Sequence, residues 1–395
     1  MSPLPRLRRR GAEPDGSPTL LVDHWYSHAV GHVIEALRRC QGYHACDPAL
    51  RISLVLNGAS PTELAGFVPF VERAFAIPYT SFGAIEGDPR GALRGVPRDW
   101  DHVVHHPAAT DPFEARFEGL RRYYEVSRRH FRGRRSRGVA GEPPPPYEPH
   151  QILRLRLPDA ERARASEALA GRRSIAVMPA GSASLRALYP SVTSWNLILD
   201  ELERRFPDVV FALVGRLRPG GGRTTSGITR PEVDALLAPR PRSLDLFDRP
   251  LTEQLAAVEA ATLFLSPHTG FGFAAVAVGT PWLSLAGGDW HETFFNGVPF
   301  HSVLPKSREH VAFVQSKPLP MIDADDDGEG ARTATMSARR ISEDLDELAD
   351  AAVALVEGRI SYEDALAAYF PPLLEAYGGD ASRIHTFEDI HLRYV

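Results

Sequence analysis

Residues 261–287 constrain the fold of this chain more than any other segment. An apolar run typical of a buried strand, 263–266, leads into a glycine-rich turn at 268–272. Small and apolar residues at 273–278 favour a helix, and 282–285 form a second apolar run. A strand, a turn, a helix and a second strand make a βαβ unit, whose turn lies at the carboxyl edge of a parallel sheet. We therefore expect a parallel α/β fold around this segment.

The turn at 268–272 has the features of an anion-binding turn. The first N–H groups of a helix have no partner within the helix and can hold a phosphate. Two glycines let the chain bend and let a ligand approach the backbone. The alternative is a tight strand-to-helix connection that binds nothing. The candidate contacts in this turn are His268, Thr269, Gly270, Phe271 and Gly272.

The composition limits the class of protein. A chain of 395 residues predicts about two domains, and 43% hydrophobic and 24% charged residues are typical of soluble globular proteins. The net charge of −5 gives no reason to expect a nucleic-acid partner. Cys40 and Cys46 cannot by themselves make a disulfide framework or a thiolate metal site, which favours a reducing cytoplasm. The sequence has neither a secretory signal nor an apolar run of the ~20 residues that span a membrane.

Strand-like and helix-like segments alternate along the chain, which predicts parallel sheets covered on both faces. In the first half we expect strands at 20–23, 51–56 and 101–104, and helices at 29–39, over most of 61–75, and at 111–131 with Asp111 as N-cap. In the second half we expect strands at 174–178, 209–214 and 244–247, and helices at 195–206 after the cap Ser194, at 251–261, at 337–357, and at 361–369 with a capping box from Ser361 to Asp364.

These segments predict two Rossmann-like domains with a ligand between them, beyond the carboxyl ends of both sheets. The expected division is a disordered tail at 1–17, an N-terminal domain at 18–165, a C-terminal domain at 166–335 and closing helices at 336–395. The Pro- and Arg-rich stretch 133–150 is expected to be a solvated loop or linker; contact with an anionic substrate is the alternative.

Three loops of the second domain should converge, because each directly follows an expected strand. The first, 179–186, has small and hydroxyl residues that suit a diphosphate, and its arginine could neutralise one. The second is the pair at 215–216, and the third is the turn at 268–272. Together they predict a nucleotide site. The candidate residues in the first two loops are Gly181, Ser182, Ser184, Arg186, Gly215 and Arg216.

At these motifs the chain resembles the GT-B glycosyltransferases, and among them the heptosyltransferase family of ADP-heptose-type transferases. The resemblance covers about residues 174–288 and extends faintly to 20–56. The matching stretches are Met178–Gly181, Ala187–Pro190, Ser194–Ile198, Leu251–Leu255, Ala261–Ser266, His268–Gly270, Ala274–Ala275, Gly279–Pro281 and Leu285–Gly287. The resemblance implies two Rossmann-like domains facing each other across a cleft, a nucleotide-sugar donor in the second domain, an acceptor in the first, and no metal or other cofactor.

The chain departs from the family pattern at residues that matter for the donor. His268 stands where the family has aspartate, and Phe273 where it has histidine. The family lysine aligns with Ala187, beside Arg186, and the Gly-Asp of the first domain becomes Gly31-His32. The resemblance therefore implies nucleotide-sugar binding but not a heptose donor.

The position of His32 makes it the expected general base, because a histidine that titrates near neutrality can take a proton from an acceptor hydroxyl. His28 and His24 are rivals in the same loop, and Asp23 could orient any of the three. The alternative is that His32 only packs or caps the first helix. His268, at a helix N-terminus, is expected to bind phosphate rather than act as base.

These features together predict a cytoplasmic glycosyltransferase that moves a hexose- or heptose-like sugar onto a hydroxyl or amine, with secondary-metabolite tailoring as a plausible setting. The acceptor is a small molecule or a glycan, and the oligomeric state is left open. The alternatives are a nucleotide-sugar epimerase or hydrolase, and a non-catalytic nucleotide-binding protein. The acidic run 323–328 is expected to be a solvated loop, with a metal–diphosphate motif as the alternative.

Overall fold

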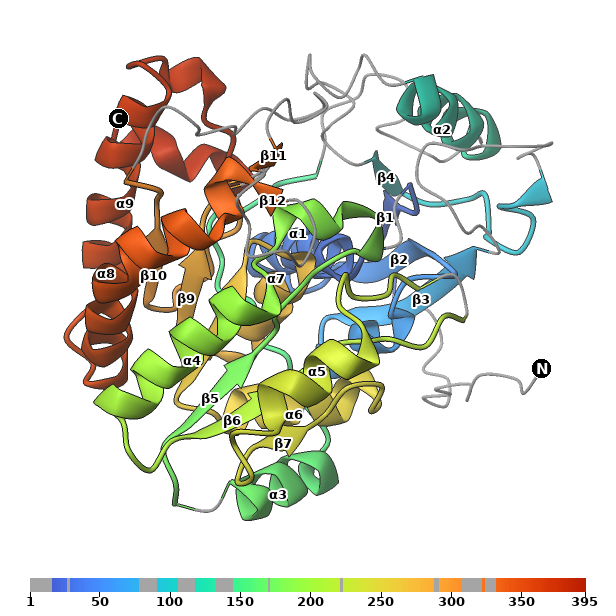
Figure 1. Ribbon diagram of the computed structural model, residues 1–395. Coiled ribbons are helices and arrows are strands. Elements are labelled where there is room, and N and C mark those ends of the chain that lie inside the picture. The colour runs from blue at the N-terminus through green and yellow to red at the C-terminus, as the bar shows by residue number, and fades with distance from the viewer. Residues whose placement is uncertain are drawn as a thin grey trace.

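The protein is known here from a computed structural model, which describes residues 16–26, 29–77, 91–105, 118–132, 145–169, 171–220, 223–287, 291–306, 322–323 and 332–395. Two parallel sheets with helices packed on them make up this part of the chain, as expected for an α/β fold (Figure 1). His28, Asp111, residues 324–328, residues 133–144 and the tail before residue 16 lie outside it.

The first sheet has four strands in the order β3-β2-β1-β4, all parallel. The elements of this half are β1 (Thr19–His24), α1 (Val30–Cys46), β2 (Arg51–Asn57), the 3-10 helix η1 (Thr62–Phe67), β3 (Val71–Ile77), β4 (His102–His105) and α2 (Glu118–His130). Side chains alternate along β1: Leu20 and Val22 join the apolar cluster that contains α1, whereas Leu21 joins the cluster on the opposite face, with Tyr123 of α2.

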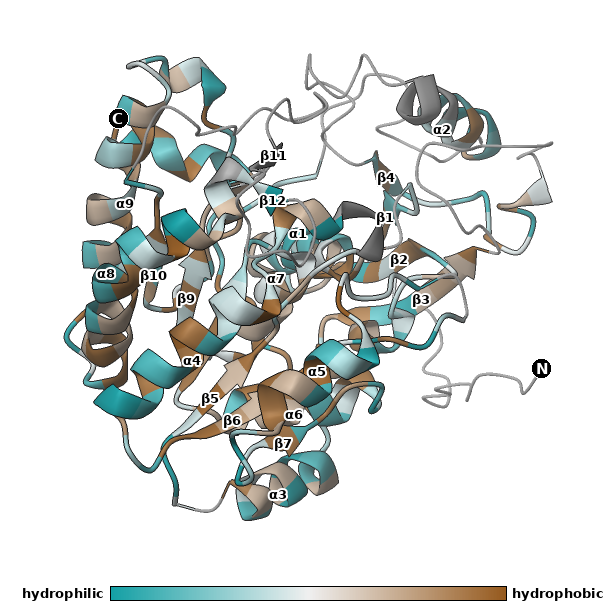
Figure 2. Ribbon diagram, viewed as in Figure 1, coloured by the Kyte–Doolittle hydropathy of each residue, from teal (hydrophilic) through white to brown (hydrophobic). Residues whose placement is uncertain are grey.

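The second sheet has six parallel strands in the order β10-β9-β8-β5-β6-β7. Its strands are β5 (Ser174–Val177), β6 (Val210–Leu213), β7 (Leu244–Asp245), β8 (Leu263–Pro267), β9 (Trp282–Leu285) and β10 (Phe300–Val303). The helices of this half are α3 (Asp159–Ala168), η5 (Ala183–Leu188), α4 (Val192–Arg205), α5 (Arg230–Leu237), α6 (Leu251–Ala260), α7 (Gly270–Val278), α8 (Ala338–Val356) and α9 (Tyr362–Ala376). Figure 2 shows hydrophobic residues along β5 and β6 and both kinds along α4.

Each sheet has one place where the order of its strands reverses. In the first sheet this is β1, which lies between β2 and β4; in the second it is β5, between β6 and β8. Connections on the two sides of such a point run to opposite faces of the sheet, so the loops that leave the carboxyl ends of the neighbouring strands diverge and leave room for a ligand. The strand order thus marks the loops after β1 and β4, and those after β5 and β8, as the places for chemistry.

Most of the predicted elements are confirmed, including the capping box of Ser361 and Asp364. The helix predicted over 61–75 is wrong: a 3-10 helix ends at Phe67, and 71–77 pair with β2 as an edge strand, buried only at Phe75 and Ile77. The cap of α4 is also corrected, since Ser191 rather than Ser194 caps it, and Ser194 donates its N–H to Ser191. The helix α7 begins at Gly270, three residues earlier than predicted.

The buried guanidinium of Arg38 in α1 holds the two halves together. It donates to the carbonyl oxygen of Phe295 and forms an ion pair with Glu388, 3.1 Å away, in the C-terminal 3-10 segment η9 (Phe387–Arg393). It also lies 5.3 Å from the ring centre of Phe294. One buried apolar cluster continues from α1 into α7 and α9. The first helix is therefore fixed against the second half along its length.

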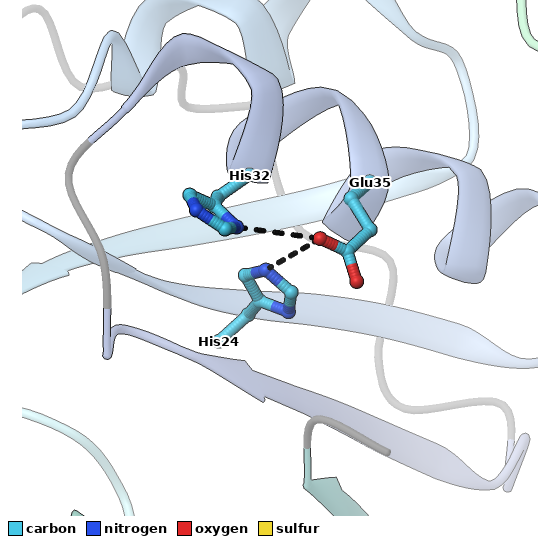
Figure 3. Close-up of side chains that lie close together, drawn as sticks. All are labelled: His24, His32 and Glu35. Carbon is cyan, nitrogen blue, oxygen red and sulfur yellow. Dashed lines mark hydrogen bonds and ion pairs between the residues drawn. The ribbon is translucent and has the colours of Figure 1, made fainter. Parts of the chain in front are cut away.

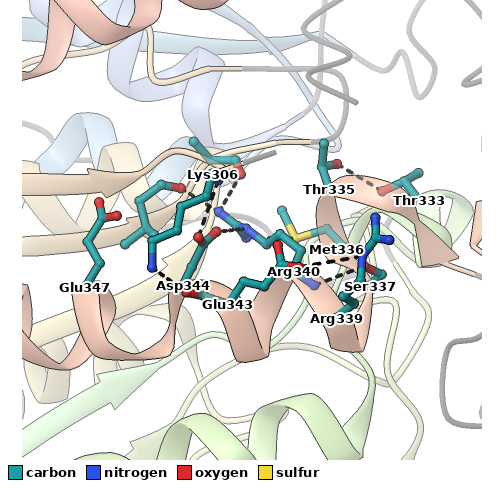
Figure 4. Close-up of polar contacts among 12 residues, drawn as sticks. Lys306, Thr333, Thr335, Met336, Ser337, Arg339, Arg340, Glu343, Asp344 and Glu347 are labelled. Atoms are coloured by element: carbon teal, nitrogen blue, oxygen red, sulfur yellow. Dashed lines mark hydrogen bonds and ion pairs between the residues drawn. The ribbon is translucent and has the colours of Figure 1, made fainter. Parts of the chain in front are cut away.

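A second buried arginine, Arg340, fixes α8 on the carboxyl ends of β9 and β10. It donates to Asp344 at 2.7 Å, to the carbonyl of Ala286 at 3.1 Å and to that of Val303 at 2.6 Å (Figure 4). Ser337 caps the helix by accepting the N–H of Arg340. Arg340 therefore links α8 to the carboxyl edge of the second sheet. The turn between β8 and α7 lies at the same edge.

Replacing Arg340 tests this link. We expect Arg340→Met to lower the free energy of unfolding by about 3–5 kcal/mol, because the Asp344 carboxylate loses its buried cation. The neighbouring Arg339, whose side chain is 62% exposed, pairs loosely with Glu343 at 3.9 Å. Arg339→Met is the matched control and should cost less than about 1 kcal/mol. Urea unfolding of both variants gives the comparison, and equal losses would contradict a special role for Arg340.

Candidate functional site

The first turns of α1 and α7 touch each other. A Cβ atom placed on Gly31 would lie 3.0 Å from the Cα of Gly270, and one on Gly270 would lie 3.0 Å from the backbone nitrogen of Gly31. Both neighbours are backbone, so a side chain at either position would require the two helices to move apart by a few tenths of an ångström. Each helix carries partial positive charge at its N-terminus. The two helices that follow β1 and β8 therefore bring two electropositive ends to one place.

His268 lies just before α7 and faces a buried carboxylate. Its Nδ1 is 3.8 Å from Oε1 of Glu292, whose side chain is 1% exposed. Glu292 also accepts hydrogen bonds from Ser284 of β9, from Ser302 of β10 and, at 3.0 Å, from Tyr369 of α9. The two serines stand near the carboxyl ends of their strands. Side chains of β9, β10 and α9 therefore surround the Glu292 carboxylate, which lies close to His268 just before α7.

The charge state of Glu292 follows from these contacts. Burial alone raises the pKa of a carboxyl group, but the nearby His268, together with the hydrogen bonds from Ser284 and Ser302, lowers the pKa of Glu292 to about 2. The ionised Glu292 carboxylate therefore lies 3.8 Å from the His268 imidazole, just before the start of α7.

The loop after β5 meets the loop after β8, as the sequence predicts. A Cβ atom on Gly181 would lie 2.6 Å from the hydroxyl of Tyr189 and 3.1 Å from Cγ2 of Thr269. The carbonyl of Gly181 accepts the N–H of Gly227 at 2.7 Å. Thr269 caps α7 by accepting from Gly272. Candidates from two of the three predicted loops therefore lie side by side.

The second loop, at 215–216, is tied to the first loop, at 179–186. Gln254, buried in α6, accepts the N–H of Gly215 at 2.9 Å and donates to its carbonyl at 3.2 Å. Arg216 donates its N–H to Ser226, and an antiparallel bridge joins Ser226 to Ser182. The guanidinium of Arg216 donates to the carbonyl of Gly220 at 3.1 Å. All three predicted loops therefore belong to one connected region.

Arg186 has a partner of its own. Its guanidinium makes two hydrogen bonds to Glu232, one of them 3.1 Å long, and Glu232 also accepts from Thr229 at the start of α5. Burial raises the pKa of the Glu232 carboxyl group, but the hydrogen bonds from Thr229 and Arg186 lower that pKa by more. The net result is a pKa below the usual value of a glutamate. Neutralisation of a diphosphate by Arg186 stays a prediction, and a phosphate would share this cation with Glu232. The backbone of Ser184 lies in η5, and its side chain is outside the described part.

His32 lies in the first turn of α1 with three polar neighbours. Its Nδ1 is 2.7 Å from the hydroxyl of Tyr26. The same nitrogen is 3.3 Å from Oε2 of Glu35 (Figure 3). Nε2 of His24, at the end of β1, is 4.0 Å from the same carboxylate oxygen. The side chain of His32 is 35% exposed, that of Glu35 14%, and that of His24 is buried. His32 is thus the accessible member of this group.

The predicted role of Asp23 in orienting His32 is wrong. Asp23 and His24 are successive residues of β1, so their side chains point to opposite faces of the sheet. The Asp23 carboxylate is 2.6 Å from Nδ1 of His105, its partner in the register of β1 and β4. Glu35 is the carboxylate that contacts His32. Asp23 and His105 remain together at the reversal point of the first sheet.

Several residues of the site were missed from the sequence. Glu35 follows His32 by three residues on a predicted helix, a spacing that places both on one face and could have revealed it. Glu292 and Gln254 carry no comparable signal, because their partners lie on other strands or loops. Tyr26 precedes His32 by six residues, but it lies before the helix, so no helical spacing links the two. The aromatic residues Phe294, Phe295 and Phe300 are buried in the core and do not line the site.

No protein-family model matches the chain, and no curated protein is similar to it. Several solved structures are similar to the chain. The family 9 glycosyl transferase from Veillonella parvula is 11% identical with a TM-score of 0.50, over 84% of this chain and 97% of that one. The ADP-heptose LPS heptosyltransferase II of E. coli is 16% identical with a TM-score of 0.47, over 84% and 98%. A putative UDP-N-acetylglucosamine 2-epimerase from Listeria monocytogenes is 12% identical with a TM-score of 0.41, over 94% and 99%.

The likeness to the Veillonella enzyme establishes the architecture of this chain as GT-B, an α/β fold with two Rossmann-like halves. At such low identity it establishes the fold alone. In the described segments, no helix is both long enough and apolar enough to cross a bilayer.

The ionised state of Glu292 gives a prediction on stability. Because its pKa falls from 4.5 to about 2 on folding, its charge stabilises the fold above about pH 4.5, and this contribution is lost as the pH falls towards 2. Glu292→Gln should therefore unfold more easily than the unaltered protein at pH 7, and the difference should shrink on acidification. Denaturant unfolding at pH 7 and pH 3 measures it.

The matched control for this experiment is Glu125→Gln, at a side chain that is 64% exposed. Its effect on unfolding should stay within about 1 kcal/mol. A Glu292→Gln penalty of the same size at both pH values would show that the buried carboxyl is not ionised.

Proposed function

We propose that this protein is a glycosyltransferase that moves a sugar from a nucleoside-diphosphate sugar to a hydroxyl or amine acceptor. The observation that carries the proposal is the contact of the α1 and α7 N-termini at Gly31 and Gly270. His32 follows this contact on one helix and His268 precedes it on the other. The proposed base, His32, and the proposed anion site at His268 therefore lie on opposite sides of the contact between the two helices. Transfer of a sugar between two substrates requires such a pair of groups.

The departing diphosphate is assigned to the start of α7. Negative charge grows on the bridging oxygen as its bond to the sugar breaks, and preorganised N–H groups and cations there lower the barrier. The first-turn amides of α7 and the His268 ring beside them supply these donors, with Glu292 as the group that positions His268. No step requires a metal ion, and the donor loops around Gly181 and Gly215 surround the same region.

His32 is assigned as the base that accepts the proton of the acceptor. The carboxylate of Glu35 can only accept, so the tautomer with the proton on Nδ1 of His32 is favoured and Nε2 keeps its lone pair. The acceptor oxygen forms its bond to the anomeric carbon while its proton passes to Nε2. Tyr26 and Glu35 hold the ring in place. His28 remains a rival that no contact tests.

The donor sugar is proposed to be a hexose or a heptose-like sugar. The E. coli enzyme is named for ADP-heptose, but the family residues at two donor positions are replaced here. Phe273 stacks on Phe294 with ring centres 4.9 Å apart, and His268 is held by Glu292. The acceptor, a small molecule or a glycan, is assigned to the first half. Secondary-metabolite tailoring in the cytoplasm is the setting that we propose.

The base assignment predicts the effect of replacing His32. With a matched donor and acceptor, His32→Gln should lower kcat by about 10²–10⁴-fold, since proton removal then falls to water. His301→Gln is the control, because His301 pairs with Glu347 at 3.1 Å on the outer edge of the second sheet. A radiolabelled-sugar transfer assay measures both, and an unchanged rate in His32→Gln sinks the assignment.

The donor site predicts binding of a nucleoside diphosphate without metal. In the presence of a chelator, the matching diphosphate at 100 times its Kd should stabilise the fold by about 2.7 kcal/mol. A thermal-shift series over ADP, GDP, UDP, CDP and dTDP measures this. Stabilisation that requires a divalent ion would oppose the proposal. Conversion of a nucleotide sugar into its epimer without an acceptor would favour an epimerase instead.

A further inference from the structure

We propose that His24, His32 and Glu35 form a binding site for a zinc-class divalent cation, and that this ion blocks His32 as a base. The second half of the proposal rests on the proposed function; the first half does not. One ligand atom from each of the three residues lies within 4.8 Å of the others. Imidazole nitrogen and carboxylate oxygen are the donors that zinc takes in sites of this kind.

The spacing of the donor atoms fits such an ion. Ligands held about 2.0–2.1 Å from a tetrahedral zinc lie about 3.4 Å from one another. Oε2 of Glu35 is 3.3 Å from Nδ1 of His32 and 4.0 Å from Nε2 of His24. Figure 3 shows both rings directed at this one oxygen. The His32–Glu35 pair already has the required distance, and a small movement of the carboxylate closes the His24–Glu35 pair. The third pair, His24 and His32, lies within 4.8 Å and closes with a small movement of the half-exposed His32 ring.

The three ligands stand on rigid elements. His24 ends β1, and His32 and Glu35 are three residues apart on α1, which places both on one face of the helix. The second oxygen of Glu35 lies 3.7 Å from the guanidinium of Arg39, one turn further on. Arg39 thus holds the carboxylate from behind and directs Oε2 at the two histidines, as groups behind metal ligands commonly do.

The site is open on one side. His24 is buried and Glu35 nearly so, whereas the side chain of His32 is 35% exposed. An ion therefore enters past His32 and displaces the hydrogen bond between His32 Nδ1 and the Tyr26 hydroxyl. Three protein ligands leave one position for water, which is the pattern of exchangeable rather than closed structural zinc sites.

Coordination changes what His32 can do. A neutral imidazole that ligates through Nδ1 carries its proton on Nε2. In the metal-free site, Nδ1 carries the proton and Nε2 is free to accept one. Binding of the ion thus removes the lone pair that the proposed transfer step uses. The same three residues would bind the ion and switch off the base.

Zinc binding to the chelator-treated full chain tests the site directly. The exposed Cys46 is replaced by serine in every sample, so that its thiol does not compete. Isothermal titration with Zn²⁺, checked by metal analysis after dialysis, should give one ion per chain. His24→Gln and Glu35→Gln should each weaken binding at least tenfold, and the control His301→Gln should leave it unchanged. Absent binding, or equal affinity in all variants, overturns the site.

A spectrum covers the case in which these variants fail to fold. Co²⁺ added to the chain that carries only Cys46→Ser should give visible absorption typical of nitrogen and oxygen ligands in low coordination. A spectrum of hydrated Co²⁺ alone would overturn the site without any ligand variant.

Transfer assays test the second half of the proposal. Zinc at saturating concentration should abolish transfer, chelator should restore it, and His301→Gln should show the same inhibition curve. Zinc binding with undiminished transfer overturns the block on the base but leaves the site. Zinc binding by a chain that shows no transfer with any donor counts against the proposed function, not against the site.

Discussion

The backbone contact between Gly31 and Gly270 is the constraint on which the rest of this structure depends. It brings the first turn of α1 against the first turn of α7, so that the reversal points of two separate sheets serve one site. A side chain on either glycine would force the helices apart. Arg38, in the middle of α1, and the C-terminal segment around Glu388 hold the helix in this position. The packing of the two halves and the proposed site therefore both depend on two glycines.

Charge at this contact is arranged in opposite ways on its two sides. Beside α7 a fully buried, ionised carboxylate, Glu292, stands 3.8 Å behind His268, next to the helix N-terminus to which the proposed diphosphate is assigned. Beside α1 a less buried carboxylate, Glu35, holds Nδ1 of His32 and leaves the other nitrogen available, which suits a base. In the proposed function, the two histidine–carboxylate pairs take two roles because their burial and their positions relative to the helix ends differ.

The sequence allowed the α/β class, the alternation of strands and helices, and the three donor loops to be predicted, because periodic apolar runs and glycine turns are local signals. The edge strand at 71–77 was mistaken for helix because only two of its residues are buried, so its pattern lacks the alternation of a half-buried strand. The partner of Asp23 could not be predicted for another reason. Asp23 contacts His105, 82 residues later in the chain, because the register between β1 and β4 pairs these two residues. Glu292 likewise acquires its role only through Ser284, Ser302 and Tyr369, which converge by folding.

Hydrogen exchange measured by mass spectrometry, with and without the stabilising nucleoside diphosphate, tests the central claim most directly. If the diphosphate lies where the two helix ends meet, amides in peptides that cover 268–273 should exchange at least several-fold more slowly on binding, and those at 29–33 should follow. The peptides of α3, remote from the contact, should not change. Protection confined to the acidic run at 323–328, or absent from 268–273, would contradict the account.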